Sequence, residues 1–179
     1  MIGHEIRKQW KKFVLSEGFQ YYKGKNNQLV IASNFVRIHV RLDYVPVTRD
    51  FYPECAITLC ELERDAADTP DAMYNFFDFR THELIGRLVD NAVIRLQDEC
   101  LEEAVATYSE EDFETLIEQH RVYFFPTIKN CLTREGLIEF CQKYPPKKLG
   151  LVCKQVRDWI ENNVPETINN EVSKCKAKN

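Results

Sequence analysis

The sequence lacks the local motifs by which most enzymes and metal proteins are recognised. It contains no phosphate-binding GxxxxGK[ST] loop, no GxSxG nucleophile motif and no HExxH metal motif, and only six of its 179 residues are glycine. Its four histidines, at positions 4, 39, 82 and 120, have no metal-finger spacing. These absences favour a protein without enzymatic activity, metal or cofactor, although side chains distant in sequence can still meet in a fold.

Paired cysteines and long apolar runs are missing as well. The seven cysteines form no CxxC pair, and an odd number fits poorly with a closed set of disulfides, so we expect them to be reduced. No run approaches the roughly 18 apolar residues that a membrane-spanning helix needs. The first twelve residues carry five charges and do not resemble a secretory signal. A cytoplasmic protein that does not cross a membrane is predicted.

What is present is enough apolar sequence for one core. Hydrophobic residues make up 44% of the chain and charged residues 29%, which is typical of a globular protein. No linker or internal repeat is evident, so the length favours a single domain over residues 1–179. Within it we expect an N-terminal helix and sheet over 1–63, a helical part over 64–172 and a frayed tail over 173–179.

The N-terminal third reads as one helix followed by antiparallel strands. Apolar spacing predicts a helix over Gly3 to Ser16, which Gly18 would end. Strands are predicted over 19–25, 28–33, 35–45 and 54–63, with a tight turn at 26–27 and a connection over 46–53. The third of these strands alternates, which places one set of side chains in the core: Val36, Ile38, Val40 and Leu42.

The longest amphipathic pattern covers Thr81 to Thr107 and predicts a central helix that packs on this sheet. Its apolar positions recur at helical spacing: Ile85, Leu88, Val89, Ala92, Val93, Leu96, Cys100 and Ala104. A short helix is expected before it, from Pro70 through Phe77. The predicted fold class is therefore α+β, with a four-stranded antiparallel sheet in the N-terminal third packed against a helical C-terminal two thirds.

Capping signals mark the helices that follow. Ser109 resembles an N-cap, with Tyr108 and Phe113 as a hydrophobic staple, and Thr133 resembles a second N-cap. Between these two, Pro126 is expected to kink or break the helix. Another apolar stripe spans 149–160, and a last helix is expected to begin near residues 163–166.

Charge is distributed unevenly along the chain. Residues 1–50 carry nine Lys or Arg against four Asp or Glu, residues 51–120 carry four against eighteen, and residues 121–179 carry eleven against six. No Lys or Arg occurs between Arg95 and Arg121. Such a run is most often a solvated helix face, but clustered carboxylates also attract a basic surface. We interpret it as a docking face for a basic protein partner, made of Asp98, Glu99, Glu102, Glu103, Glu110, Glu111, Asp112 and Glu114.

A second, cationic face is the alternative. The polar side of the strand over 35–45 carries Arg37, His39 and Arg41, and the predicted sheet brings Tyr21 and Lys23 near them. Cations beside an aromatic ring suit phosphate, a small ligand or single-stranded RNA. The acidic chain lacks the glycine-aromatic signature of sheet RNA binders, so the wet side of an antiparallel sheet is the simpler interpretation. A small enzyme without a recognisable motif is the other alternative.

The order of elements resembles a family of uncharacterised bacterial domains of unknown function. The resemblance rests on the N-terminal helix, Gly18-Phe19, the antiparallel strands and a helical half that contains Tyr123-Phe124-Phe125-Pro126, over about residues 5–140. It implies no catalytic residue. Some small acidic bacterial proteins of this type act as immunity partners of toxins, which implies an immunity-like role.

Overall fold

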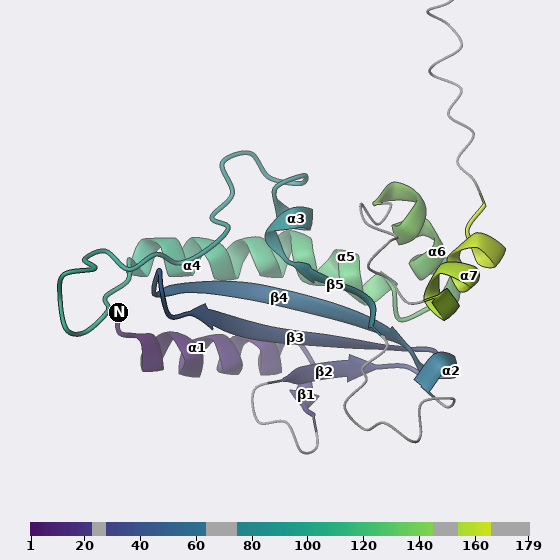
Figure 1. The fold of residues 1–179 in the computed structure, drawn as a ribbon, viewed down its shortest axis with the longest axis horizontal. Helices are drawn as coiled ribbons and strands as arrows, with labels where there is room; N and C mark the ends of the chain where they lie inside the picture. The colour runs from purple at the N-terminus through teal and green to yellow at the C-terminus, as the bar shows by residue number, and fades with distance from the viewer. Residues whose placement is uncertain (23–27, 64–74, 145–153, 166–179) are drawn as a thin grey trace, which may run out of the picture.

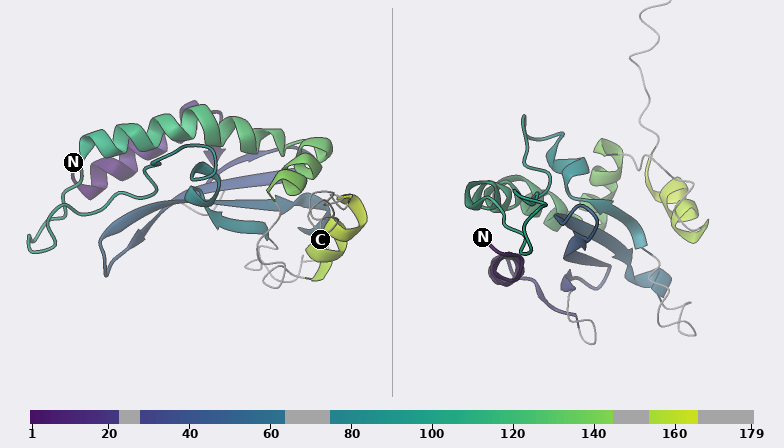
Figure 2. Two further views of the ribbon diagram at one scale, coloured as in Figure 1. Left: turned by 90° about the horizontal axis from the view of Figure 1, so that it is seen from above. Right: turned by 60° about the vertical axis from the view of Figure 1, so that its left-hand side comes forward.

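The computed structural model describes residues 1–22, 28–63, 75–144 and 154–165. They form an α+β fold in which a sheet of five antiparallel strands, in the order β1-β2-β3-β4-β5, is covered on one face by helices (Figures 1 and 2). The predicted class, with four antiparallel strands in the N-terminal part and helices after them, is confirmed. The strands are β1 Gln20–Tyr21, β2 Leu29–Ala32, β3 Val36–Val45, β4 Asp50–Leu59 and β5 Asn75–Arg80.

The long hairpin of β3 and β4 is the centre of the sheet. Ile38 pairs with Ile57 and Val40 with Cys55. Paired residues of the two strands therefore point to the same face of the sheet, and successive pairs point to opposite faces. On the helix-covered face Val36, Ile38 and Val40 are fully buried, as their alternation predicted, whereas Leu42 is only partly buried.

Two helices lie side by side over this face. Helix α1, Gly3–Ser16, has the predicted bounds and buries Ile6, Trp10, Phe13 and Val14. Gly18, at φ +91°, ends it in a conformation that costs a glycine little. Helix α4, Glu110–Gln119, continues through the π-helical turn η2, His120–Phe124, into α5, Phe125–Asn130.

Local capping rules correctly placed the start of two helices. The Asp112 amide donates to the Ser109 hydroxyl at 3.1 Å, and the Gly136 amide donates to that of Thr133 at the head of α6, Arg134–Lys143. The helix does not break at Pro126. Instead the Phe125 amide bonds the His120 carbonyl five residues earlier, so one π turn precedes the proline. Helix α7, Lys154–Asn163, overlaps the predicted stripe over 149–160 and extends past its end. The predicted last helix falls largely outside the described residues.

The predicted central helix over 81–107 is wrong. Only α3, His82–Ile85, is helical, and the chain then runs through turns to Tyr108. Leu96 instead forms a β-bridge with Phe51, each amide bonding the other residue's carbonyl at 3.0 Å. Gly86 and Asn91, the latter at φ 54°, also fit a helix poorly. Of the predicted stripe, Ile85 and Leu96 are buried, but most of the other positions are only partly buried and Ala104 is exposed. The sheet edge beside Phe51 offered the backbone another partner.

Three further boundaries differ from the prediction. The segment of the expected short helix that is described, from Asn75, is strand β5, which pairs with β4. Strand β4 begins at Asp50, so Pro53 lies inside it opposite Leu42. It ends at Leu59, and helix α2, Cys60–Glu63, follows. The turn predicted at 26–27 and the frayed tail over 173–179 lie outside the described residues.

Truncating Ile38 to Ala is expected to lower the free energy of unfolding by roughly 2–5 kcal/mol, because its side chain is fully buried. Leu88→Ala is the matched comparison, since Leu88 lies half-buried in the irregular segment and its loss should cost about 1 kcal/mol or less. Urea unfolding of both variants measures the difference. Equal losses would contradict the burial described for the two residues.

Candidate functional site

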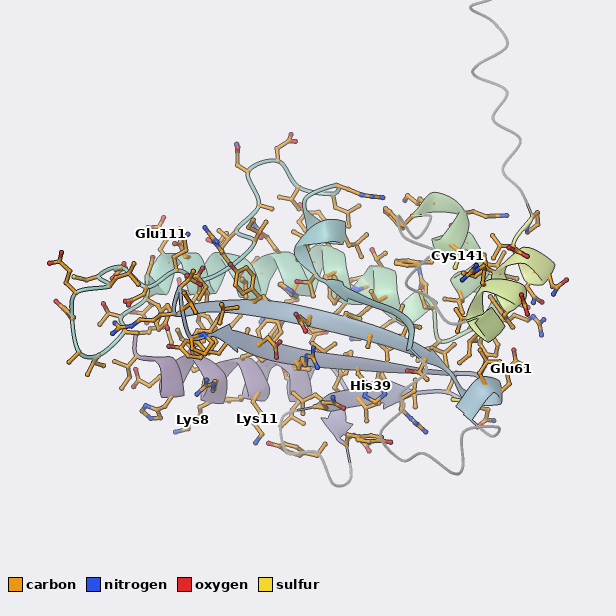
Figure 3. The ribbon with its side chains drawn as sticks, viewed as in Figure 1. Lys8, Lys11, His39, Glu61, Glu111 and Cys141 are labelled. Atoms are coloured by element: carbon orange, nitrogen blue, oxygen red, sulfur yellow. The ribbon has the colours of Figure 1, made fainter. Side chains whose placement is uncertain are left out.

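Helix α4 carries the densest part of the acidic run. Its buried side, with Phe113 and Leu116, packs into the core, and this orientation points the rest of the helix outward. Every charged residue of α4 is acidic and exposed: Glu110, Glu111, Asp112, Glu114 and Glu118. The helix therefore presents one sign of charge to solvent, and Glu111 projects away from the sheet in Figure 3.

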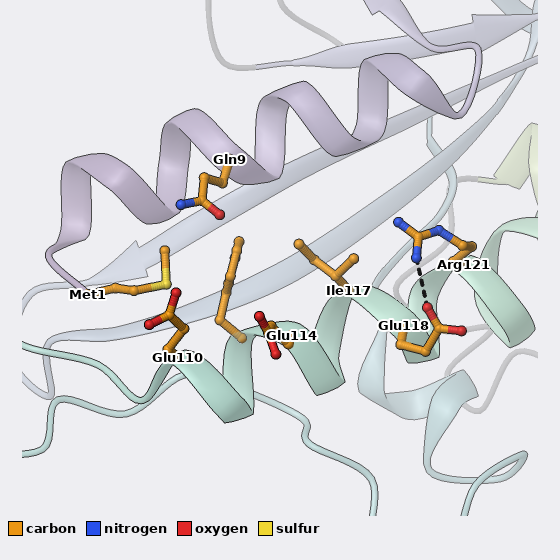
Figure 4. A pocket seen from close by; sticks show the side chains of 8 residues that line it. Met1, Gln9, Glu110, Glu114, Ile117, Glu118 and Arg121 are labelled. Atoms are coloured by element: carbon orange, nitrogen blue, oxygen red, sulfur yellow. Dashed lines mark hydrogen bonds and ion pairs between the residues drawn. The ribbon is translucent and has the colours of Figure 1, made fainter.

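A groove of about 310 Å³ separates α4 from α1 (Figure 4). Glu110, Glu114 and Glu118, one helical turn apart, line its α4 side. Ile117 points from α4 toward α1 in Figure 4, and Phe113 also lines the groove. The remaining lining residues are Met1, Gln9 and Arg121. The groove thus combines an apolar floor with an acidic wall.

Asp98 does not belong to the exposed acidic face. Its side chain is fully buried, and it accepts hydrogen bonds from Arg49 at 2.9 Å, from the Thr107 amide at 2.9 Å and from the Cys100 amide at 3.3 Å. Burial acts to raise the pKa of Asp98, but the hydrogen bonds from Arg49 and the two amides outweigh it and lower the pKa. Asp98 therefore holds together the loop over 99–107 and is a structural residue.

The loop that Asp98 closes presents the other predicted acids. Glu99, Glu102 and Glu103 are exposed on it, and Arg49 also donates to the Glu103 carbonyl at 2.8 Å. From here on, "the acidic surface" means the exposed carboxylates of this loop and of α4: Glu99, Glu102, Glu103, Glu110, Glu111, Asp112, Glu114 and Glu118.

The same loop exposes two large apolar side chains, Leu101 at 62% and Val105 at 59%. Ile2 forms a β-bridge with Thr107, and the Tyr108 amide donates to the Met1 carbonyl at 2.9 Å. These bonds join the loop to the start of α1 beside the groove. The acidic surface therefore contains apolar side chains that a partner can contact.

The cationic face assembles only in part. Arg37, His39 and Arg41 share one face of β3, but the sheet register puts Tyr21 on the other, and Lys23 lies outside the described residues. The ring beside the cations is that of Tyr22, which contacts His39 with ring centroids 5.1 Å apart. The predicted strand over 19–25 includes Tyr22, but the prediction placed Tyr21 and Lys23 on the cationic face and so assigned the two faces of this strand the wrong way round.

Neighbouring groups engage all three of these side chains, since Arg37 and His39 both lie against the Tyr22 ring, at 5.5 Å and 5.1 Å from its centroid. Arg41 donates through Nε to Glu54 at 2.8 Å and lies 3.4 Å from Asp43. His39 is only 3% exposed. The face therefore offers little unpaired positive charge for a phosphate.

Three titratable side chains outside the acidic surface, those of His120, Cys131 and Cys141, are buried in the core. The Nδ1–H of His120 donates to the Leu116 carbonyl at 2.7 Å, and its Nε2 accepts from the Thr81 hydroxyl at 2.9 Å. Burial lowers the pKa of His120 to about 4 and raises that of the Cys141 thiol to about 12. Burial likewise raises the pKa of Cys131. Across the described ranges, no three His, Cys, Asp or Glu side chains are grouped in a way that could hold a metal ion.

Asp98→Asn is expected to loosen the loop over 99–107, because the amide keeps the shape of the carboxylate but loses its charge toward Arg49. Hydrogen exchange at the Thr107 and Cys100 amides should become faster. Glu99→Gln, which neutralises the adjacent exposed carboxylate, is the control and should leave both exchange rates unchanged. If Asp98→Asn exchanges like the wild type, the charge of Asp98 does not hold the loop.

None of the helices in the described parts of the chain is long and apolar enough to span a membrane. Comparison with models of protein families, with curated proteins and with solved structures gave no match, so the functional argument depends on the geometry of this chain.

Proposed function

We propose that this is a non-enzymatic interaction protein that docks a basic protein partner on its acidic surface. The observation that carries the proposal is α4, where all five charged side chains are exposed carboxylates. An arginine or lysine patch on a partner would meet an uninterrupted field of opposite sign there. Such fields steer association and reject acidic competitors.

The helix dipole accounts for only part of this charge. Glu110, Glu111 and Asp112 occupy the first turn of α4, where carboxylates favour the helix. Glu114 and Glu118 lie beyond it, spaced four residues apart, where like charges repel and cost stability. Among the carboxylates of α4, only Glu118 forms an ion pair with a described residue, Arg121, at 2.7 Å. A partner's cations would relieve this repulsion.

The exposed side chains of Leu101 and Val105 indicate that the partner also has an apolar surface. Interfaces that persist combine apolar contacts at the centre with charges at the rim. We expect the partner to present an apolar patch bordered by Lys or Arg. An immunity-like role, in which the basic partner is a toxin, stays a prediction. The cationic face of β3 gives less support to a nucleic-acid or small-ligand function, because Arg41 is paired with Glu54.

Affinity capture from the native host, followed by mass spectrometry, would identify candidate partners. The discriminating bait carries Glu102, Glu103, Glu114 and Glu118 all changed to Lys, since these four exposed residues lie outside the first turn of α4. Glu135→Lys with Glu139→Lys is the control, because both are exposed on α6, away from the acidic surface. We expect a basic protein that the control retains and the quadruple variant loses.

A further inference from the structure

Helices α1 and α4 carry opposite charge on neighbouring surfaces. Helix α1 has four Lys or Arg and one Glu, whereas the charged residues of α4 are all acidic. Two of the cations pack on rings: Arg7 lies 5.1 Å from the Phe51 centroid and Lys11 4.3 Å from the Tyr21 centroid. The other two, Lys8 and Lys12, are exposed, and Lys8 points away from the sheet in Figure 3.

The charges on the two helices have the same spacing, and Lys8 and Lys12 lie outside the lining of the groove, to which α1 contributes Gln9. Lys8 and Lys12 are four residues apart, as are Glu114 and Glu118, so each pair lines one side of its helix. Both helices start at the same end of the groove and run in the same direction (Figure 4). Within the described residues, no ion pair joins Lys8 or Lys12 to a carboxylate of α4. The two charged surfaces are adjacent but do not neutralise each other.

We propose that a second copy of this chain docks here, with α1 of each molecule over α4 of the other. The inference rests on the proposed function, because it names the basic helix α1 of a second copy as the surface that the acidic surface binds. A two-fold axis parallel to the helices, running along the groove between the two molecules, produces this exchange. Lys8 and Lys12 of each copy then face the carboxylates of its partner, twice in one interface.

The symmetry follows from the charge pattern. A two-fold axis across the helices would place α1 on α1 and α4 on α4, where like charges meet. The axis along the groove pairs opposite charges at both contacts and brings the two apolar floors, with Phe113 and Ile117, toward each other. Because exposed ion pairs are individually weak, we expect dissociation constants of about 10 µM or weaker at low salt.

Sedimentation equilibrium of the full chain from about 1 to 500 µM tests this directly. We expect dimers in about 0.05 M NaCl, and a dissociation constant at least about tenfold higher in about 0.5 M NaCl. Wild-type protein that stays monomeric over this range at low salt would overturn the proposal.

A charge swap identifies the interface. The variant Lys8→Glu with Lys12→Glu and the variant Glu114→Lys with Glu118→Lys should each be monomeric, because both contacts become repulsive. Mixed in equal amounts they should dimerise again, since each altered surface then meets its complement. Glu135→Lys with Glu139→Lys repeats the acid reversal on α6 at the same spacing and should dimerise like the wild type. A mixture that remains monomeric, or a Glu114/Glu118 variant that still dimerises, would refute the interface.

Binding of an oligolysine of about twelve residues, measured by calorimetry at low salt, separates this inference from the function on which it rests. A monomeric protein that binds oligolysine, with binding lost in the Glu114/Glu118 variant, refutes the second copy and leaves the acidic surface as a docking face for another partner. A monomeric protein that binds no oligolysine contradicts both proposals.

Discussion

Acidification from pH about 6.5 to about 4 is expected to lower the free energy of unfolding by roughly 3 kcal/mol through His120 alone. In the folded protein this ring is fully buried and neutral, and burial holds its pKa at about 4. In the unfolded chain the ring is solvated and protonates near its ordinary pKa of 6.5.

The sign of the effect follows from proton counting. Between these two pKa values the unfolded state binds a proton that the folded state does not, so the unfolded state gains stability as pH falls. The contribution of His120 is complete above pH about 6.5 and is lost toward pH about 4, with a slope of at most about 1.4 kcal/mol per pH unit. Urea unfolding measured at intervals across this range gives the slope.

Two variants isolate the histidine from the carboxylates that also titrate. His120→Asn can still donate to the Leu116 carbonyl but cannot titrate; it should be less stable at pH 7 and should lose this part of the slope. His4→Gln removes an exposed ring and should keep the wild-type slope. The assignment fails if His120→Asn retains the wild-type dependence between pH 6.5 and 4.

Reversing Glu102, Glu103, Glu114 and Glu118 to Lys is expected to slow association with a captured basic partner by roughly tenfold or more at low salt. The four positions are exposed and lie outside the buried side of α4, so the fold should survive, which circular dichroism and urea unfolding check. Dissociation should change by less than about threefold, because charges at a rim act mainly on encounter.

For the exposed apolar residues of the loop over 99–107, we expect substitution to change the dissociation rate and not the association rate. Leu101→Ser with Val105→Ser should speed dissociation and leave the association rate close to that of the wild type, because these side chains contribute contact area and no charge. Val122→Ser, which removes an exposed apolar side chain from η2, is the matched control. If reversal of the four acids alters dissociation alone, the acidic surface does not steer encounter.

Sequence patterns within a few residues predicted helix α1, the starts of α4 and α6, and the buried face of β3. The bounds of α1 and the caps at Ser109 and Thr133 follow from hydrogen bonds within a few residues, which a sequence window contains. The buried face of β3 followed from alternation, because the helices that cover the sheet bury Val36, Ile38 and Val40 completely. These elements could be read without knowledge of the rest of the chain.

The segment over 81–107 could not be read in this way. Its apolar residues repeat at helical spacing, but its conformation depends on Phe51, about 45 residues earlier, and on Arg49, which binds Asp98. Sequence alone does not show that β5 stops short of Phe51 and leaves that edge to Leu96. Long-range pairing outweighed local periodicity here.

The candidate site was predicted as a set of charges but not as a surface. Seven of the eight predicted acids are exposed, and the exception, Asp98, has an ion-pair partner 49 residues earlier in the chain. The groove beside Glu114 depends on how α1 packs against α4, and nothing in either helix alone indicates it. Composition could identify the charge, and only tertiary structure could show which carboxylates are available.

The central claim, that the acidic surface steers a basic partner, is tested most directly by the salt dependence of the association rate constant. Stopped-flow mixing of the wild type and the quadruple Lys variant with the captured partner, from about 0.05 to 0.5 M NaCl, provides it. The wild-type rate constant should fall by about tenfold or more across this range, while that of the variant should rise or stay level. Equal rate constants with equal salt dependence in the two proteins would contradict the claim and leave the carboxylates of α4 as a solvated helix face.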